Sequence, residues 1–214
     1  MPKQEHVSLP VIRRLPRYYR FLGDLLKNSI TRISSKELSA RMGLTASQIR
    51  QDLNCFGGFG QQGYGYNIEH LYHQIGQILG VDEVLPTIIV GAGNLGRAMA
   101  TQIDFEQRGF KLIGIFDVDQ NIVGQTIQNI VVQNISELET FCKKNKPKIA
   151  IFSIPREAAP VMAHRLVELG ITGFWNFTHY DIGIKYPHIP VENVHLSDSL
   201  MTLSYRVKDK TNHS

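Results

Sequence analysis

The fold of this chain is decided by the stretch Ile88-Ile89-Val90-Gly91-Ala92-Gly93-Asn94-Leu95-Gly96. An apolar run leads directly into the pattern G-x-G-x-x-G, and apolar residues then recur at helical spacing as far as Ile103. In a strand-turn-helix unit of this kind, three glycines let a dinucleotide pyrophosphate approach the helix N-terminus. The stretch therefore predicts a dinucleotide-binding unit. Its candidate cofactor-binding residues are Gly91, Ala92, Gly93, Asn94, Leu95 and Gly96.

A second apolar run, residues 111–116, ends at Asp117. An acidic residue roughly twenty positions beyond the glycines accepts hydrogen bonds from the adenosine ribose in such folds. No arginine stands beside Asp117 to accept a 2′-phosphate, so the sequence favours NAD(H) over NADP(H). We therefore add Asp117 and Val118 to the cofactor-binding residues. A glycine-rich turn in another doubly wound protein is the alternative interpretation.

The rest of this region continues to alternate between strands and helices. Apolar runs at 130–132, 149–153 and 174–176 alternate with helical patterns at 136–144 and 156–169, the first of which opens with a capping-box spacing from Ser136 to Glu139. This order predicts an α/β fold, a Rossmann-like doubly wound parallel sheet with helices on both faces. Ligands bind at the carboxyl ends of such strands, which adds Pro155, Asn176 and Phe177 as candidates.

Two short helices joined at Gly43 precede this region, at about 35–42 and 46–54. Ser34 with Glu37, and Thr45 with Gln48, have the capping-box spacing. This pattern is typical of a helix-turn-helix, whose second helix reads DNA. The outward residues of that helix, with side chains suited to base edges and phosphates, are Ser47, Gln48, Arg50, Gln51 and Asn54. A helical hairpin with a polar outer face is the alternative.

Residues 56–66 contain five glycines between four aromatics. Glycines permit a tight hairpin and aromatics can pack it against the helices, so the segment predicts the wing of a winged helix, with Gln61 and Gln62 at its tip. A flexible linker is the alternative. A helix from Asn67 to Gly80 follows, and His70 and His73 on it are interpreted as a polar flank, so no metal site is expected.

Charge is distributed unevenly along the 214 residues. Residues 1–80 hold ten Lys/Arg against five Asp/Glu, and all ten basic residues lie at or before Arg50. This excess favours a polyanion partner, although a solvated basic face would look the same. No apolar run has membrane-spanning length and no signal peptide is visible. Two cysteines without pairing or metal spacing, Cys55 and Cys142, suggest buried or inert thiols and the cytoplasm.

These observations divide the chain into residues 1–80, a winged-helix domain, 81–195, a Rossmann domain, and 196–214, a C-terminal helix and tail. The sheet uses nearly all of 81–195, so no substrate domain remains. Tyr180 and Lys185 miss the Tyr-x-x-x-Lys spacing of short-chain dehydrogenases by one residue, and we expect no enzyme activity. The tail carries Leu200, Leu203 and Val207 on one face. We expect this face to pack against an apolar surface, either of a twofold partner or of its own subunit.

Over nearly its full length the chain resembles the Rex family of redox-sensing transcriptional repressors. The resemblance rests on residues 12–20, 34–38, 47–53, 56–66, 91–96, 116–119 and 191–194. It implies a homodimer with a swapped C-terminal helix, which binds a palindromic, inverted-repeat operator in double-stranded DNA and releases it when NADH binds. Arg50 and neighbouring cations such as Arg14 would contact DNA. It also implies that Arg20, Gln102, His195 and Leu196 couple the redox state to the head.

Several residues depart from what relatives of this family often carry. Gln102 stands where many have Tyr, His195-Leu196 where many have Asp-Phe, and Thr178-His179 where many have Ala-Pro. These positions concern the discrimination between NADH and NAD⁺. Gln51 and the wing glutamines replace basic residues, and glutamine pairs with adenine, so we predict an operator richer in A·T pairs. The rival functions are a small NAD-dependent oxidoreductase and a DNA-binding scaffold that senses nothing.

Overall fold

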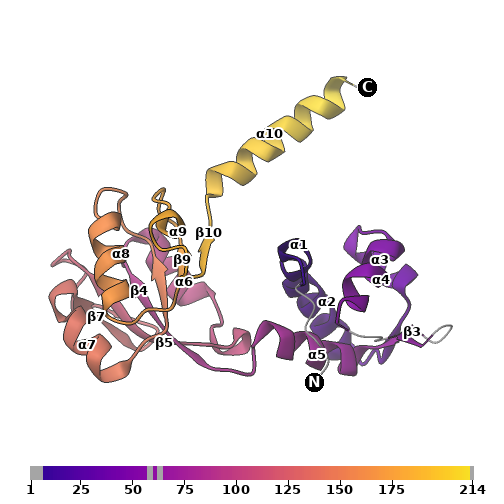
Figure 1. Cartoon of the computed structure of the whole chain (residues 1–214), viewed down its shortest axis with the longest axis horizontal. Helices are drawn as coiled ribbons and strands as arrows, with labels where there is room; N and C mark the ends of the chain where they lie inside the picture. The colour runs from indigo at the N-terminus through magenta and orange to yellow at the C-terminus, as the bar shows by residue number, and fades with distance from the viewer. Residues whose placement is uncertain (1–6, 57–59, 62–64, 213–214) are drawn as a thin grey trace. The chain divides into compact units, whose positions relative to one another are not determined.

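A computed structural model describes residues 7–56, 60–61 and 65–212 of the chain (Figure 1). Contacts between residues divide it into two compact units, Met1–Asp82 and Glu83–Ser214, and each unit is described by itself. The first unit is mainly helical, with a small sheet. The second unit holds a larger, mainly parallel sheet with helices. The predicted combination of a winged helix and an α/β fold is confirmed.

The helices of the first unit surround one apolar core. They are α1 (Leu9–Ile12), α2 (Leu15–Lys27), α3 (Ser35–Met42), α4 (Ala46–Asn54) and α5 (Ile68–Leu79). Leu22 of α2, Leu38 of α3 and Leu71 of α5 are fully buried in this core. Ile49 and Leu53 attach α4 to it. One face of α4 is thereby fixed inward and the opposite face remains available.

The helix-turn-helix is closed by its caps, one complete and one partial. Ser34 accepts a hydrogen bond from the Glu37 amide at 3.1 Å, and Glu37 accepts one from the Ser34 amide at 2.8 Å. Gly43 then ends α3 with φ 62°. Thr45 caps α4, but the second predicted capping box is wrong, because the Gln48 amide group turns to Asp52 instead of the cap.

The predicted wing is an antiparallel hairpin. Strand β2 (Gly60–Gln61) pairs with β3 (Gly65–Asn67), which also pairs with β1 (Arg32–Ile33). Gly65 has φ 70°, and a Cβ there would stand 2.7 Å from the carbonyl oxygen of Ile33, so only glycine fits. Gln62 lies outside the described residues, and so does the hairpin turn that would carry it.

The second unit is built on a sheet whose order, among the described residues, is β10-β9-β8-β4-β5-β7-β6. The strands are β4 (Leu85–Val90), β5 (Phe110–Asp117), β6 (Thr126–Ile127), β7 (Ile130–Asn134), β8 (Ile149–Phe152), β9 (Gly173–Asn176) and β10 (Val191–Asn193). All neighbours are parallel except β6 and β7, which form an edge hairpin. The strand order reverses between β4 and β8, the place where doubly wound sheets bind ligands.

Helices cover both faces of this sheet. They are α6 (Asn94–Gln102), α7 (Leu138–Asn145), α8 (Ala159–Glu168) and the short α9 (Ile182–Lys185), whereas α10 (Leu196–Asn212) extends away from the sheet and its apolar side chains are exposed (Figure 1). Ile88 and Val90 pack with α7 and α8 on one face, whereas Ile89 packs with α6 on the other. Strands buried on both faces explain why β4 is apolar at successive positions.

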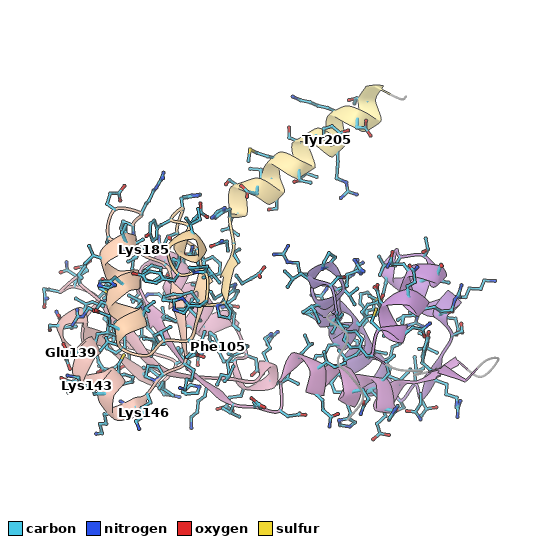
Figure 2. The ribbon with its side chains drawn as sticks, in the orientation of Figure 1. Phe105, Glu139, Lys143, Lys146, Lys185 and Tyr205 are labelled. Atoms are coloured by element: carbon cyan, nitrogen blue, oxygen red, sulfur yellow. The ribbon has the colours of Figure 1, made fainter. Side chains whose placement is uncertain are left out.

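The start of α7 differs from the sequence-based expectation. The predicted Ser136–Glu139 capping box is absent, because Asn134 accepts the Ser136 amide hydrogen bond at 2.9 Å and opens a 3₁₀ turn first. Glu139 lies instead one turn from Lys143 on α7, and its carboxylate meets that ammonium at 2.6 Å (Figure 2). The two short strands β6 and β10 were not predicted.

Candidate functional site

The three glycines of the turn between β4 and α6 have different surroundings. Gly91 has φ 99°, and a Cβ there would overlap the carbonyl oxygen of Ser153. A Cβ on Gly96 would overlap the carbonyl oxygen of Gly91. Gly93, by contrast, would meet nothing within 4 Å. Two glycines therefore allow the backbone to pack tightly, and the middle one leaves open space above the turn.

That open space lies at the N-terminus of α6. Gly93, Asn94 and Leu95 are exposed there. Gly93 is the N-cap, and no side chain accepts a hydrogen bond from the first amides of this helix in the described part of the chain. These amides and the positive end of the helix dipole are suited to a phosphate group. The cradle fits a dinucleotide pyrophosphate.

Asp117, at the end of β5, holds the same turn from the side. One carboxylate oxygen accepts a hydrogen bond from the Ala92 amide at 2.6 Å. The other accepts from the amides of Val118 at 2.7 Å and Asp119 at 2.9 Å. A carboxylate offers about two lone pairs on each oxygen, so the oxygen bound to the Ala92 amide remains able to accept a hydrogen bond from a ribose hydroxyl. Val118 is exposed beside this carboxylate.

The ends of β8 and β9 supply the other predicted cofactor residues, in unequal ways. Pro155 is exposed and Phe177 is half-buried, with its ring 4.8 Å from that of Trp175. Asn176 is completely buried, and its amide group donates to the Tyr180 carbonyl and to the Asn193 side chain. Its oxygen accepts from Thr178. The side chain of Asn176 thus organises the loop after β9.

Ser153 belongs to this site and was not among the predicted residues. Its hydroxyl donates to the Gly91 carbonyl at 2.9 Å, so β8 supports the glycine turn directly. A small polar residue immediately after a buried apolar strand was the available sequence signal. The pairing itself joins positions 62 residues apart, and no local pattern reveals it.

The four residues expected to couple the redox state to the head lie in three places: on α2, at the end of α6 and at the start of α10. Arg20 is exposed on α2 of the first unit. Gln102 is exposed at the end of α6. Together with Phe105 (labelled in Figure 2), it lines a hollow of about 420 Å³. The His195 ring lies 5.1 Å from the His179 ring, and its buried Nε2 has no hydrogen-bond partner among the residues that the structure describes. Leu196, the next residue, is exposed.

The predicted DNA-reading helix shows one exposed polar face. Ser47, Arg50, Gln51 and Asn54 are exposed on α4 at helical spacing. Arg50 also donates to the Ser35 hydroxyl at 3.1 Å, which links α4 to α3. Gln48 differs, because it is only half-exposed and its amide nitrogen donates to Asp52 at 2.9 Å. Gln61 lies in β2 of the wing.

Arg14, predicted to contact DNA, is bound within the protein. Its Nε and Nη2 donate to the two oxygens of Asp52, each at 2.7 Å. Burial opposes ionisation of Asp52, but the hydrogen bonds from Arg14, Gln48 and Tyr18 outweigh it and hold the pKa of this carboxyl below its ordinary value. The pKa of the Arg14 guanidinium is raised, mainly by its hydrogen bonds to Asp52.

The remaining sequence predictions concern cysteines, metals and membranes. Of the two thiols expected to be buried or inert, Cys142 is buried and Cys55 is exposed at the end of α4. Within 7–56, 60–61 and 65–212, no three metal-ligating side chains form a cluster. No helix in the same ranges is long and apolar enough to cross a membrane.

Two family models match the chain. The model described as "Putative DNA-binding protein N-terminus" matches residues 6–54, and the model described as "CoA binding domain" matches residues 82–180. The first covers the helix-turn-helix and the second covers the glycine turn with Asp117. Each match therefore coincides with one of the two sites described above.

Named relatives match over nearly the whole chain. One is the redox-sensing transcriptional repressor Rex of Caldicellulosiruptor saccharolyticus, 54% identical over 98% of this chain and 95% of its own. A crystal structure of RSP in complex with beta-NAD⁺ and operator DNA is 52% identical, has a TM-score of 0.88 and covers 98% of this chain and 96% of its own. A structure of RSP with beta-NADH is 49% identical, with a TM-score of 0.87 and coverage of 98% of each chain.

Proposed function

The chain belongs to the Rex family of redox-sensing transcriptional repressors, and from this premise we propose that it senses the NADH/NAD⁺ ratio. It binds a palindromic operator and leaves that operator when NADH binds. The observation that carries this proposal is the open space above Gly93, at a helix N-terminus that no described side chain caps, beside Asp117. Among relatives of about half identical sequence, one structure holds operator DNA with NAD⁺ and another holds NADH.

The proposed cofactor is NAD(H). The α6 amides bind its pyrophosphate, and Asp117 accepts hydrogen bonds from the adenosine ribose. A phosphate on that ribose would place negative charge against the Asp117 carboxylate, which disfavours NADP(H). Pro155 and Phe177 line the way toward the nicotinamide, and Asn176 holds their loop in place.

The proposed DNA contacts come from α4 and the wing. Ser47, Gln51 and Asn54 reach base edges, while Arg50 contacts phosphate or a base edge. The wing glutamines, Gln61 and Gln62, are further proposed DNA contacts, and glutamine favours adenine. Each phosphate neutralised by a cation releases counterions, so binding falls steeply as salt rises.

The proposed dimer is held by α10. Leu196, Leu200, Leu203 and Val207 form one exposed apolar face of this helix, and Tyr205 projects from another (Figure 2). A helix with apolar side chains on two faces is suited to lie between two surfaces, which a twofold partner supplies. Two heads then meet the two half-sites of an inverted repeat. We further propose that the protein acts in the cytoplasm, where its operator lies.

The coupling step depends on a difference in affinity between two arrangements of the dimer. A ligand shifts such an equilibrium only by binding one arrangement more tightly. When bound, the reduced nicotinamide supplies a neutral ring and the oxidised one a cation, and a cation enters an apolar pocket less readily. Arg20, Gln102, His195 and Leu196 are the proposed residues of this step. We also propose the division into 1–80, 81–195 and 196–214.

The competing enzyme function is not favoured, because the near full-length relatives are named transcriptional repressors. The experiment begins with selection of an operator from random duplexes by the full-length protein. NADH and NAD⁺ are then titrated against the protein-operator complex. We expect NADH to release the operator at concentrations where NAD⁺ does not. Full occupancy by NADH with undiminished operator affinity would contradict the proposal, and hydride transfer to a carbonyl compound would support the enzyme.

A further inference from the structure

Asp52 is a charged residue buried inside the helix-turn-helix, on the inner face of α4. Only 1% of its surface is exposed. Its Oδ2 accepts from Arg14 Nε at 2.7 Å and from the Tyr18 hydroxyl at 2.9 Å. Its Oδ1 accepts from Arg14 Nη2 at 2.7 Å and from Gln48 Nε2 at 2.9 Å. A buried carboxylate is tolerated only with such complete pairing.

The hydrogen bonds to Asp52 fix how α4 is oriented. Arg14 immediately precedes α2, and Tyr18 lies on α2. Both bind Asp52 on α4, and the planar guanidinium of Arg14 does so through two hydrogen bonds, so α2 is attached to α4 at this point. Leu53, the next residue, is fully buried, and Arg50 meets Ser35 on the other side. Rotation of α4 about its own axis would break these contacts together.

Asp52 also restricts the side chain of Gln48. It lies in the first turn of α4, the part of a recognition helix that meets base edges. Its amide nitrogen, however, donates to Asp52 one helical turn later. Adenine recognition by glutamine needs both the amide nitrogen and the amide oxygen. In this conformation Gln48 cannot supply that pair, whereas the neighbouring Gln51 is exposed.

We propose that Asp52 is a positioning residue for operator recognition, which orients α4 through Arg14 and Tyr18 and withholds Gln48 from base contacts. Base reading then falls to the exposed residues of α4, Ser47, Arg50, Gln51 and Asn54. The inference rests on the proposed DNA-binding function and assigns side chains within it. It also removes Arg14 and Gln48 from the direct DNA contacts expected from the sequence.

The first experiment separates reading from positioning. The affinity of the full-length protein is measured for the selected operator and for every single-base-pair change in it. Gln51→Ala is the matched control. It should reduce the ratio of affinities for the preferred and the other base pairs at one position by about tenfold, which is the discrimination that one good contact provides. Gln48→Ala should leave every preference within about twofold of the wild type, a change too small for a lost base contact. Loss of the base-pair preference at any operator position in Gln48→Ala would overturn the proposal.

The second experiment tests Asp52 itself. Asp52→Asn keeps the size of the side chain and removes its charge, and Tyr18→Phe removes one hydrogen bond if the first variant does not fold. We expect the ratio of operator affinity to unrelated-DNA affinity to fall about tenfold, as for one mismatched base pair. NADH affinity, which depends on the second unit, should not change. A variant that only melts earlier, with the affinity ratio intact, would overturn the proposal.

Failure of the proposed function gives a different result. If the wild-type protein shows no preference for any duplex, the proposed DNA recognition fails, and the positioning inference that rests on it fails with it. If the wild type selects an operator and Asp52→Asn selects it equally well, only the positioning inference fails. The wild-type affinity ratio is therefore measured first.

Discussion

The Asp117 carboxylate accepts a 2.6 Å hydrogen bond from the Ala92 amide, which ties the end of β5 to the glycine turn that follows β4. The same carboxylate is the predicted ribose acceptor. Substitution of Asp117 would therefore disturb the turn and the nucleotide contact together. Gly93 and Gly96 separate these effects better, because a Cβ on Gly96 would overlap the Gly91 carbonyl oxygen and a Cβ on Gly93 would meet nothing within 4 Å.

Gly93→Ala and Gly96→Ala should fail in different ways. Gly93 has φ −63° and empty space around a Cβ, so alanine should change the unfolding free energy by less than about 0.5 kcal/mol. NADH affinity should fall about tenfold or more, because the methyl group occupies the phosphate position. Gly96→Ala, which overlaps the Gly91 carbonyl, should cost about 1–3 kcal/mol of stability. Denaturant unfolding and NADH titration of both variants provide the measurement, and equal stabilities would contradict this assignment.

The elements predicted well are those whose signal is local. The glycine turn, the Ser34–Glu37 cap and the wing hairpin all follow from residues close together in the chain. The predicted capping box at Gln48 is wrong because the Gln48 side chain donates to Asp52, a carboxylate whose burial depends on Arg14, 38 residues earlier in the chain. Sequence periodicity predicts on which face of a helix a residue lies, but not which residue its side chain contacts. A polar side chain at the border between the buried and the exposed face can point toward the core or toward solvent.

The two cysteines should differ sharply in reactivity. Burial raises the pKa of the Cys142 thiol to about 11, whereas Cys55 is exposed at the end of α4. The thiolate is the reactive form, so an alkylating reagent at pH 7.5 should label Cys55 and leave Cys142 unmodified in the folded protein. Cys55→Ser should lose the labelling and Cys142→Ser should keep it. Rapid labelling of both thiols without denaturant would contradict the burial of Cys142.

The first unit should lose stability in acid through Asp52. Its carboxyl pKa is lowered in the folded state, so this contribution is present above the unfolded pKa, about 3.9, and disappears as pH falls through the folded value. The pKa of Tyr18 is raised, first by burial and then by Asp52, so stability should also fall as pH rises beyond about 10. Denaturant unfolding across this range measures both limbs. Asp52→Asn should flatten the acid limb, and an unchanged acid limb would contradict the assignment.

The dimer should depend on the apolar face of α10. Leu200 is 67% exposed on that face, and a charge there would be buried if a partner covers it. We expect Leu200→Asp to yield monomers in analytical ultracentrifugation at concentrations where the wild type is dimeric. Leu200→Met, the matched control, should remain a dimer because it preserves the apolar volume. A dimeric Leu200→Asp protein would show that α10 packs on its own subunit.

The exposed Gln51 should set one base-pair preference of the operator. Glutamine pairs with adenine through two hydrogen bonds, whereas lysine favours guanine, so Gln51→Lys should exchange an A·T preference for a G·C preference at one position. Gln51→Ala should lose the first preference without acquiring the second, which separates base reading from a gain of general phosphate affinity. The added positive charge should also steepen the salt dependence if lysine contacts phosphate instead. An unchanged preference in Gln51→Lys would therefore mean that α4 enters the groove with another face, and the orientation fixed by Asp52 would have to be reconsidered.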